Sequence, residues 1–188
     1  NAANWFHRWA SGFSRDAFDD ILEFETGGML EIWADLYGAT GEQKHLELIH
    51  LYDRPRLFEP LLRGEDVLTN YHANTTIPEV LGAARAWEVT GEQRYRDITE
   101  AYWNMAVTNR GWYATGGQTN GEAWTPPHIL SSRPGVRNPE HCVVYNKMRL
   151  AGTPCRWKGD HCDSGCLERN FYKRMLAQAR PDSGQGGL

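Results

Sequence analysis

Ten residues decide the fold that we expect. The segment LYGATGEQKH at positions 36–45 returns as AWEVTGEQRY at positions 86–95, and a weaker third copy, RWKGDH, occupies positions 156–161. In each copy, apolar residues at helical spacing run into a glycine, then an acidic residue, then a second helical stretch. Glycine ends a helix readily because it adopts the left-handed conformation, and an acidic side chain favours the start of the next helix. The repeats therefore predict an all-α stack of helical hairpins.

The connections between these hairpins are expected to carry function. Three stretches lack a helical period, at positions 63–75, 109–127 and 128–139, and long irregular connections in compact domains are often functional. We expect the helix before the second repeat to open with a capping box at Thr76–Glu79. We also expect a short hairpin near positions 112–114, and a tight turn in the Gly-rich run 115–121 that presents Glu122.

The composition excludes several classes of protein. The 188 residues are enough for one domain, 1–188, with a sizeable core, and 40% of them are apolar. A net charge of −4 without a cluster of Lys and Arg argues against a nucleic-acid partner. No apolar run reaches the ~18–20 residues that span a membrane. Eight Trp and eight Tyr either fill helix interfaces or offer flat rings to a carbohydrate. Neither homo-oligomer formation nor the cellular compartment is decided by the sequence.

Glu122 is the candidate general acid. It follows the Gly-rich turn and stands two residues from Trp124. A carboxyl group beside an indole loses part of its hydration, which raises its pKa and suits it to donate a proton. The alternative is a glutamate on a solvated loop.

Glu140 and Cys142 form the candidate metal site. They stand together at the expected start of a helix, and carboxylate and thiolate are both ligands of zinc. The alternative is a capping glutamate beside a small buried thiol. The later cysteines, at positions 155, 162 and 166, either complete a metal site or form disulfides. His72 and Asn74 precede a helix, where they either bind a ligand or cap the helix.

Taken in order, these segments resemble the zinc-dependent β-L-arabinofuranosidases of glycoside hydrolase family 127. The resemblance spans roughly residues 20–188, and its matching segments are TGGMLE at 26–31, ADLY at 34–37, HANTTIP at 72–78, ATGG at 114–117, GE at 121–122, EHCVVYN at 140–146, RW at 156–157, LAQ at 176–178 and PDSG at 181–184.

The resemblance implies a fold and a reaction. The family has an (α/α)6-barrel catalytic domain followed by β-sandwich domains, and it releases terminal β-L-arabinofuranose with retention of configuration. By motif, Glu122 matches the acid/base and Glu140 and Cys142 match two zinc ligands. His72 and Asn74 match a sugar-contacting stretch.

The sequence also departs from the family. The family's nucleophile is a zinc-bound cysteine in an adjacent cysteine pair, and this sequence contains no such pair. We expect part of the barrel, with zinc as cofactor, a carbohydrate as substrate and doubtful activity for this chain alone. The alternatives are a carbohydrate-binding helical domain that uses Trp112, Trp124 and His72, and a cysteine-stapled structural fragment.

Overall fold

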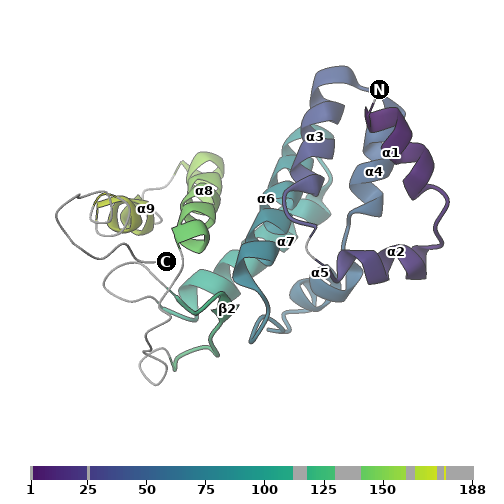
Figure 1. The fold of residues 1–188 in the computed structure, drawn as a ribbon. Coiled ribbons are helices and arrows are strands. Elements are labelled where there is room, and N and C mark those ends of the chain that lie inside the picture. Colours follow the sequence, from purple (N-terminus) through teal and green to yellow (C-terminus); the bar gives the residue numbers. More distant parts are fainter. Residues whose placement is uncertain are drawn as a thin grey trace.

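The structure is a computed structural model, and it describes residues 2–24, 26–111, 118–129, 141–159, 164–172 and 176. Figure 1 shows helices side by side with one small hairpin. The elements are α1 (Ala2–Ala10), α2 (Arg15–Leu22), α3 (Met29–Thr40), α4 (Gln43–Leu51), α5 (Pro55–Leu62), α6 (Ala73–Thr90), α7 (Gln93–Trp103), the π-helix η1 (Asn104–Thr108), β1 (Thr119–Asn120), β2 (Ala123–Trp124), α8 (His141–Lys158) and α9 (Ser164–Asn170). The predicted all-α class is confirmed.

The repeated segments form the turns of helical hairpins. α3 packs on α4, α6 on α7 and α8 on α9. Gly41 and Gly91 end α3 and α6 with φ of 66° and 74°, and each donates its N–H to a carbonyl of the preceding turn, at 2.8 Å. Gly159 has φ of 62° in the third copy. Because only glycine takes this conformation without strain, it stands at each of these helix ends.

The first helices of the three hairpins lie side by side and run in the same direction. α6 packs between α3 and α8. Asn74 contacts Asn146, and two to four turns later Glu88 contacts Arg156, so α6 and α8 are parallel. A Cβ on Gly82 would lie 2.6 Å from Leu30, and a Cβ on Gly38 would lie 2.9 Å from Val89, so α3 and α6 are parallel and approach closely. The N-terminal ends of α3, α6 and α8 therefore face the same end of the molecule.

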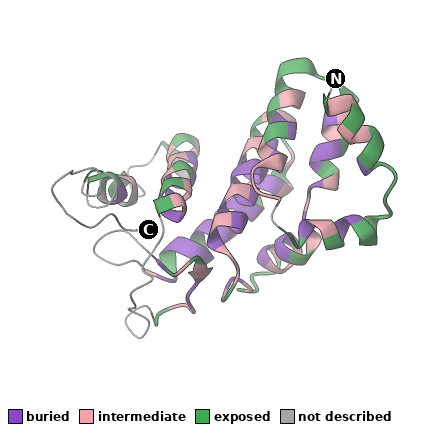
Figure 2. Ribbon diagram, in the orientation of Figure 1, coloured by how far each residue is buried: buried purple, intermediate pink, exposed green. Residues whose placement is uncertain are grey.

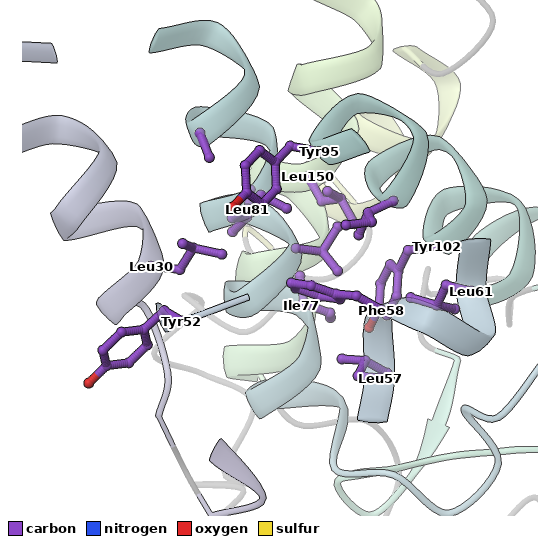
Figure 3. Packing of buried hydrophobic residues seen from close by; sticks show 14 of the residues in the cluster. Leu30, Tyr52, Leu57, Phe58, Leu61, Ile77, Leu81, Tyr95, Tyr102 and Leu150 are labelled. Carbon is purple, nitrogen blue, oxygen red and sulfur yellow. The ribbon is translucent and has the colours of Figure 1, made fainter. Parts of the chain in front are cut away.

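The core lies between these helices. Most of its buried side chains come from α2 to α7 and from α8, and Figure 3 shows Ile77, Phe58 and Tyr102 packed together. α6 is buried along most of its length, whereas α1 and α2 keep exposed faces (Figure 2). Among the described residues, no helix is long and apolar enough to cross a membrane.

Two local predictions are wrong or fall outside the description. α6 begins at Ala73 with His72 as its N-cap, three residues before the expected capping box. The box does not form because Thr76 lies within the helix and bonds back to the His72 carbonyl, while Glu79 binds Arg54 instead. The hairpin expected near 112–114 lies outside the described residues. The described hairpin is β1–β2, a few residues later.

Candidate active site

Glu122 lies in the tight turn of the β1–β2 hairpin. Thr119 pairs with Trp124 and Asn120 pairs with Ala123, which leaves Gly121 and Glu122 as the two connecting residues. Gly121 has φ of 62°, a conformation that tight hairpin turns require and glycine adopts freely. Residues 115–117 of the predicted Gly-rich turn lie outside the described residues, and the described tight turn consists of Gly121 and Glu122.

The hairpin is joined to the start of α6 through the backbone. His72 forms a β-bridge with Ala123, and the Ala73 N–H donates to the Glu122 carbonyl at 2.8 Å. On the other side of the bridge, the Trp124 N–H donates to the Tyr71 carbonyl at 3.0 Å. Backbone bonds of this kind fix the position of Glu122 relative to the helix N-terminus.

His72 and Glu122 also meet through their side chains. Nε2 of His72 lies 2.6 Å from Oε2 of Glu122, and Nδ1 of His72 lies 2.9 Å from the Thr75 hydroxyl. The imidazole is 27% exposed and the carboxyl group 48%. Thr75 and His72 therefore orient a carboxyl group that solvent and ligands can reach. The sequence predicted both residues but did not link them.

Two buried side chains, those of Arg110 and Gln118, anchor the hairpin. Arg110 donates to the Thr125 carbonyl at 2.7 Å and to the Met105 carbonyl at 2.5 Å, and it pairs with Asp66 at 2.7 Å. Gln118 donates through Nε2 to carbonyls 106, 107 and 111. Three of these carbonyls belong to η1, whose wider turn is of a kind often found at functional sites. Sequence reasoning missed Arg110, because its partner Asp66 is 44 residues away.

Trp124 does not fit the predicted role in sugar stacking. Its side chain is 1% exposed, and its indole N–H points at the hydroxyls of Thr76 and Tyr102, at 3.2 and 3.1 Å. The ring is part of the core and has no free face. The predicted desolvation of Glu122 by this indole is not found either, since the carboxyl group is about half exposed.

A cavity opens beside His72. It has a volume of about 380 Å³ and is lined by Glu23, Phe24, Arg54, Thr69, Asn70, Tyr71, His72, Thr75 and Thr76. Arg54 lines the cavity, and its buried guanidinium lies between two carboxylates, at 2.9 Å from Glu23 and 3.0 Å from Glu79. Burial raises the pKa of Glu79 to about 7, against the opposing pull of Arg54.

The start of α8 lies on the other side of α6. Asn146 donates to the Asn74 side-chain oxygen at 2.6 Å, which joins the two helices near their N-terminal ends. Asn74 thus contacts α8. Cys142 stands in the first turn of α8 and is half-buried. The structure therefore brings His72 and Glu122 into contact and places Asn74 on the neighbouring turn of α6.

The predicted zinc site is only partly described. Two candidate ligands, Glu140 and Cys162, lie outside the described residues, as does the side chain of Cys166. Trp112, a candidate for sugar binding, also lies outside them. Within the described part of the chain, no group of three or more His, Cys, Asp or Glu side chains is arranged to hold a metal ion. Of the two predicted zinc ligands, the structure describes Cys142 but not Glu140, so the zinc site stays a prediction.

Comparison with known proteins gives one clear match. The family model described as "Beta-L-arabinofuranosidase, GH127 catalytic domain" matches residues 1–186. No curated protein matches the chain.

Proposed function

Because the chain belongs to the β-L-arabinofuranosidase, GH127 catalytic-domain family, we propose that it hydrolyses the glycosidic bond to a terminal β-L-arabinofuranosyl residue with Glu122 as the proton donor. The single observation that supports this assignment is the contact of 2.6 Å between Nε2 of His72 and Oε2 of Glu122. It places a carboxyl group, oriented by an imidazole, on a rigid turn at the end of the molecule where the parallel helices begin.

The pair is suited to move a proton in both directions. With the proton of the imidazole on Nε2, His72 donates to Oε2 of Glu122 while the Thr75 hydroxyl donates to Nδ1. This bond can form when Glu122 is ionised and also when Glu122 carries its proton on Oε1, which leaves that proton available for the leaving oxygen. His72 can therefore hold Glu122 in place both as an acid and as a base.

A retaining glycosidase needs both states. The glycosidic C–O bond breaks as the leaving oxygen takes the proton from Glu122, and a nucleophile binds the sugar carbon. In the second half, Glu122 takes a proton from the water that releases the sugar, and the acid is restored. We propose that His72 and Asn74 also contact the sugar, while the described residues identify no nucleophile.

The test is turnover of p-nitrophenyl β-L-arabinofuranoside and of a β-L-arabinofuranosyl disaccharide. Glu122→Gln should lower kcat by about 10²–10⁴-fold on the disaccharide, and by less on the aryl glycoside, whose leaving group needs little protonation. Glu92→Gln is the matched control, because Glu92 forms the same kind of pair with His50, at 2.8 Å, at the opposite end of α6. Equal losses in the two variants would contradict the assignment. Sugar binding by a wild-type chain that shows no turnover would favour the carbohydrate-binding alternative.

We further propose that zinc binds at the start of α8, with Cys142 and Glu140 as two of its ligands. The support is chemical: a thiolate is favoured in the first turn of a helix, and thiolate with carboxylate is a donor pair that zinc accepts. When bound, the metal would keep a thiolate deprotonated at neutral pH. Metal analysis should find about one zinc per chain in the wild type and in Cys155→Ser, and much less in Cys142→Ser. A metal-free wild type would contradict this proposal without bearing on Glu122.

A further inference from the structure

The cavity beside His72 lies on the side of α6 that faces away from α8. Its lining includes Glu23 and Phe24, just before α3, and Arg54, just before α5, together with residues 69–76. The start of α8 is joined to α6 through Asn74, which does not line the cavity. The Glu122–His72 pair therefore borders the cavity on one side, with the start of α8 on the other side of α6.

The cavity has the chemistry of a carbohydrate subsite. Its volume of about 380 Å³ falls in the range of roughly 300–1,000 Å³ that is usual for small-molecule sites. Its lining mixes the hydroxyls of Thr69 and Thr75 and the amide of Asn70 with two aromatic rings, those of Phe24 and Tyr71. Hydroxyls and amides pair with sugar hydroxyls, and flat rings cover the apolar C–H faces of a sugar. Phe24 is 76% exposed, the largest exposed fraction among the exposed large apolar side chains of the described residues.

The charge of the cavity favours a neutral occupant. Besides His72, Arg54 is the cation among its described lining residues, and Arg54 already donates to both oxygens of Glu23 and both oxygens of Glu79. A sugar carboxylate would find no free guanidinium donor pair there and would stand near the Glu23 carboxylate, which lines the cavity. Repulsion between two carboxylates is stronger where water is partly excluded.

We infer that this cavity binds the leaving-group side of the substrate, as a neutral sugar ring that packs against Phe24. The inference rests on the proposed function, because a proton donor must stand where the leaving group meets the bond that breaks. Glu122 then separates the bound leaving group from the sugar whose bond is cleaved. Phe24 becomes a specificity-determining residue that touches no reacting atom.

The experiment compares three substrates, two of them neutral and one charged, and uses three forms of the full chain. Methyl β-L-arabinofuranoside has a leaving group too small to reach Phe24, whereas a β-L-arabinofuranosyl disaccharide places a neutral ring in the cavity. Phe24→Ala should lower kcat/KM about tenfold on the disaccharide and less than about twofold on the methyl glycoside. Trp5→Ala is the control, since Trp5 is also an exposed aromatic residue, at 59%, and lies on α1 outside the cavity. A third substrate, a disaccharide whose second sugar is a uronic acid, should react about tenfold more slowly than the neutral one with the wild type.

The outcomes separate the two proposals. If Phe24→Ala lowers kcat/KM equally on both neutral substrates, or on neither, the cavity is not the leaving-group subsite, and the role of Glu122 stands. If the uronic acid substrate reacts as fast as the neutral disaccharide, the charge argument is wrong. If the wild type cleaves neither neutral substrate, the proposed function fails and this inference fails with it. Unchanged thermal unfolding of Phe24→Ala shows that the variant is folded.

Discussion

Replacement of Arg54 by methionine should expose how the start of α6 is stabilised. Arg54 is 3% exposed and Glu79 is 4% exposed, and the guanidinium donates to Glu79 at 3.0 and 3.2 Å and to Glu23 at 2.9 and 3.1 Å. Methionine replaces the aliphatic part of the arginine side chain but leaves the buried Glu79 carboxylate beside the Glu23 carboxylate, with no guanidinium between them. Removal of one partner from a buried ion pair costs about 3–5 kcal/mol of the free energy of unfolding.

The loss of stability caused by Arg54→Met should increase as the pH rises. Burial raises the pKa of Glu79 to about 7 in the folded chain, against 4.5 for the ordinary side chain. The folded chain thus holds a proton between pH 4.5 and 7 that the unfolded chain has lost, and the wild type loses about 3 kcal/mol of stability as the pH rises through this window. Without Arg54, the pull that lowers this pKa is gone and the folded pKa rises further. The penalty of Arg54→Met should therefore be largest at pH 8 and shrink towards pH 5, where Glu79 is neutral.

Urea unfolding, followed by circular dichroism and tryptophan fluorescence at pH 5, 6.5 and 8, measures this dependence. Arg56→Met is the matched control, because Arg56 pairs with Asp20 at 2.7 Å on the surface and its loss should leave the midpoint nearly unchanged at every pH. A penalty for Arg54→Met below about 1 kcal/mol at pH 8 would refute the reasoning. So would a penalty that stays constant from pH 5 to pH 8.

Three further substitutions test the rest of the framework. Arg110→Met should lower kcat about tenfold more than it raises KM, because the substitution loosens the hairpin that positions Glu122. Arg110→Lys should restore part of the lost activity. Steady-state kinetics on the aryl glycoside measure both effects, and an unchanged kcat in Arg110→Met would contradict the prediction. Gly82→Ala should destabilise the chain by about 1–3 kcal/mol, since the new methyl group would lie 2.6 Å from Leu30, and a melting temperature equal to that of the wild type would show that α3 and α6 are not so close. Trp124→Phe should lower the free energy of unfolding by about 1–2 kcal/mol, because the hydroxyl of Tyr102 loses a buried hydrogen-bond donor. Chemical denaturation measures this loss, and an unchanged free energy of unfolding would show that the indole N–H does not bond to Tyr102.

The helical hairpins could be predicted because their signals are local. The glycines at positions 41 and 91 stand where the chain must take positive φ, and the apolar spacing around them follows the helical period. The start of α6 was harder. Thr76 and Glu79 have the identities of a capping box, but the buried Arg54 competes for Glu79, and this partner is 25 residues away. A distant charge therefore overrode a local pattern.

The candidate site could likewise be predicted where its signals are local, but not where they depend on contacts distant in sequence. Glu122 and His72 stood out as polar residues on irregular segments, but only the structure shows that they lie in contact, beside the backbone bridge between residues 72 and 123. Trp124 was misinterpreted because a Trp beside a polar turn has the same local signature whether it faces solvent or the core. Arg110 carries no local signal, since its partners are a carboxylate 44 residues away and carbonyl oxygens that any residue could supply.

The connections at the two ends of the stacked helical hairpins differ in how well they can accommodate added residues. The turns at Gly41 and Gly91 are so short that one added residue would change which side of the next helix meets its neighbour. At the opposite end, Arg110 holds the segment between α5 and α6 and the hairpin before α8 through hydrogen bonds to Asp66 and Thr125, which are distant in sequence. Connections on the surface can be lengthened at a small cost in conformational entropy. Lineages of this architecture can therefore acquire new specificities by altering one rim while the opposite rim keeps the helices in register.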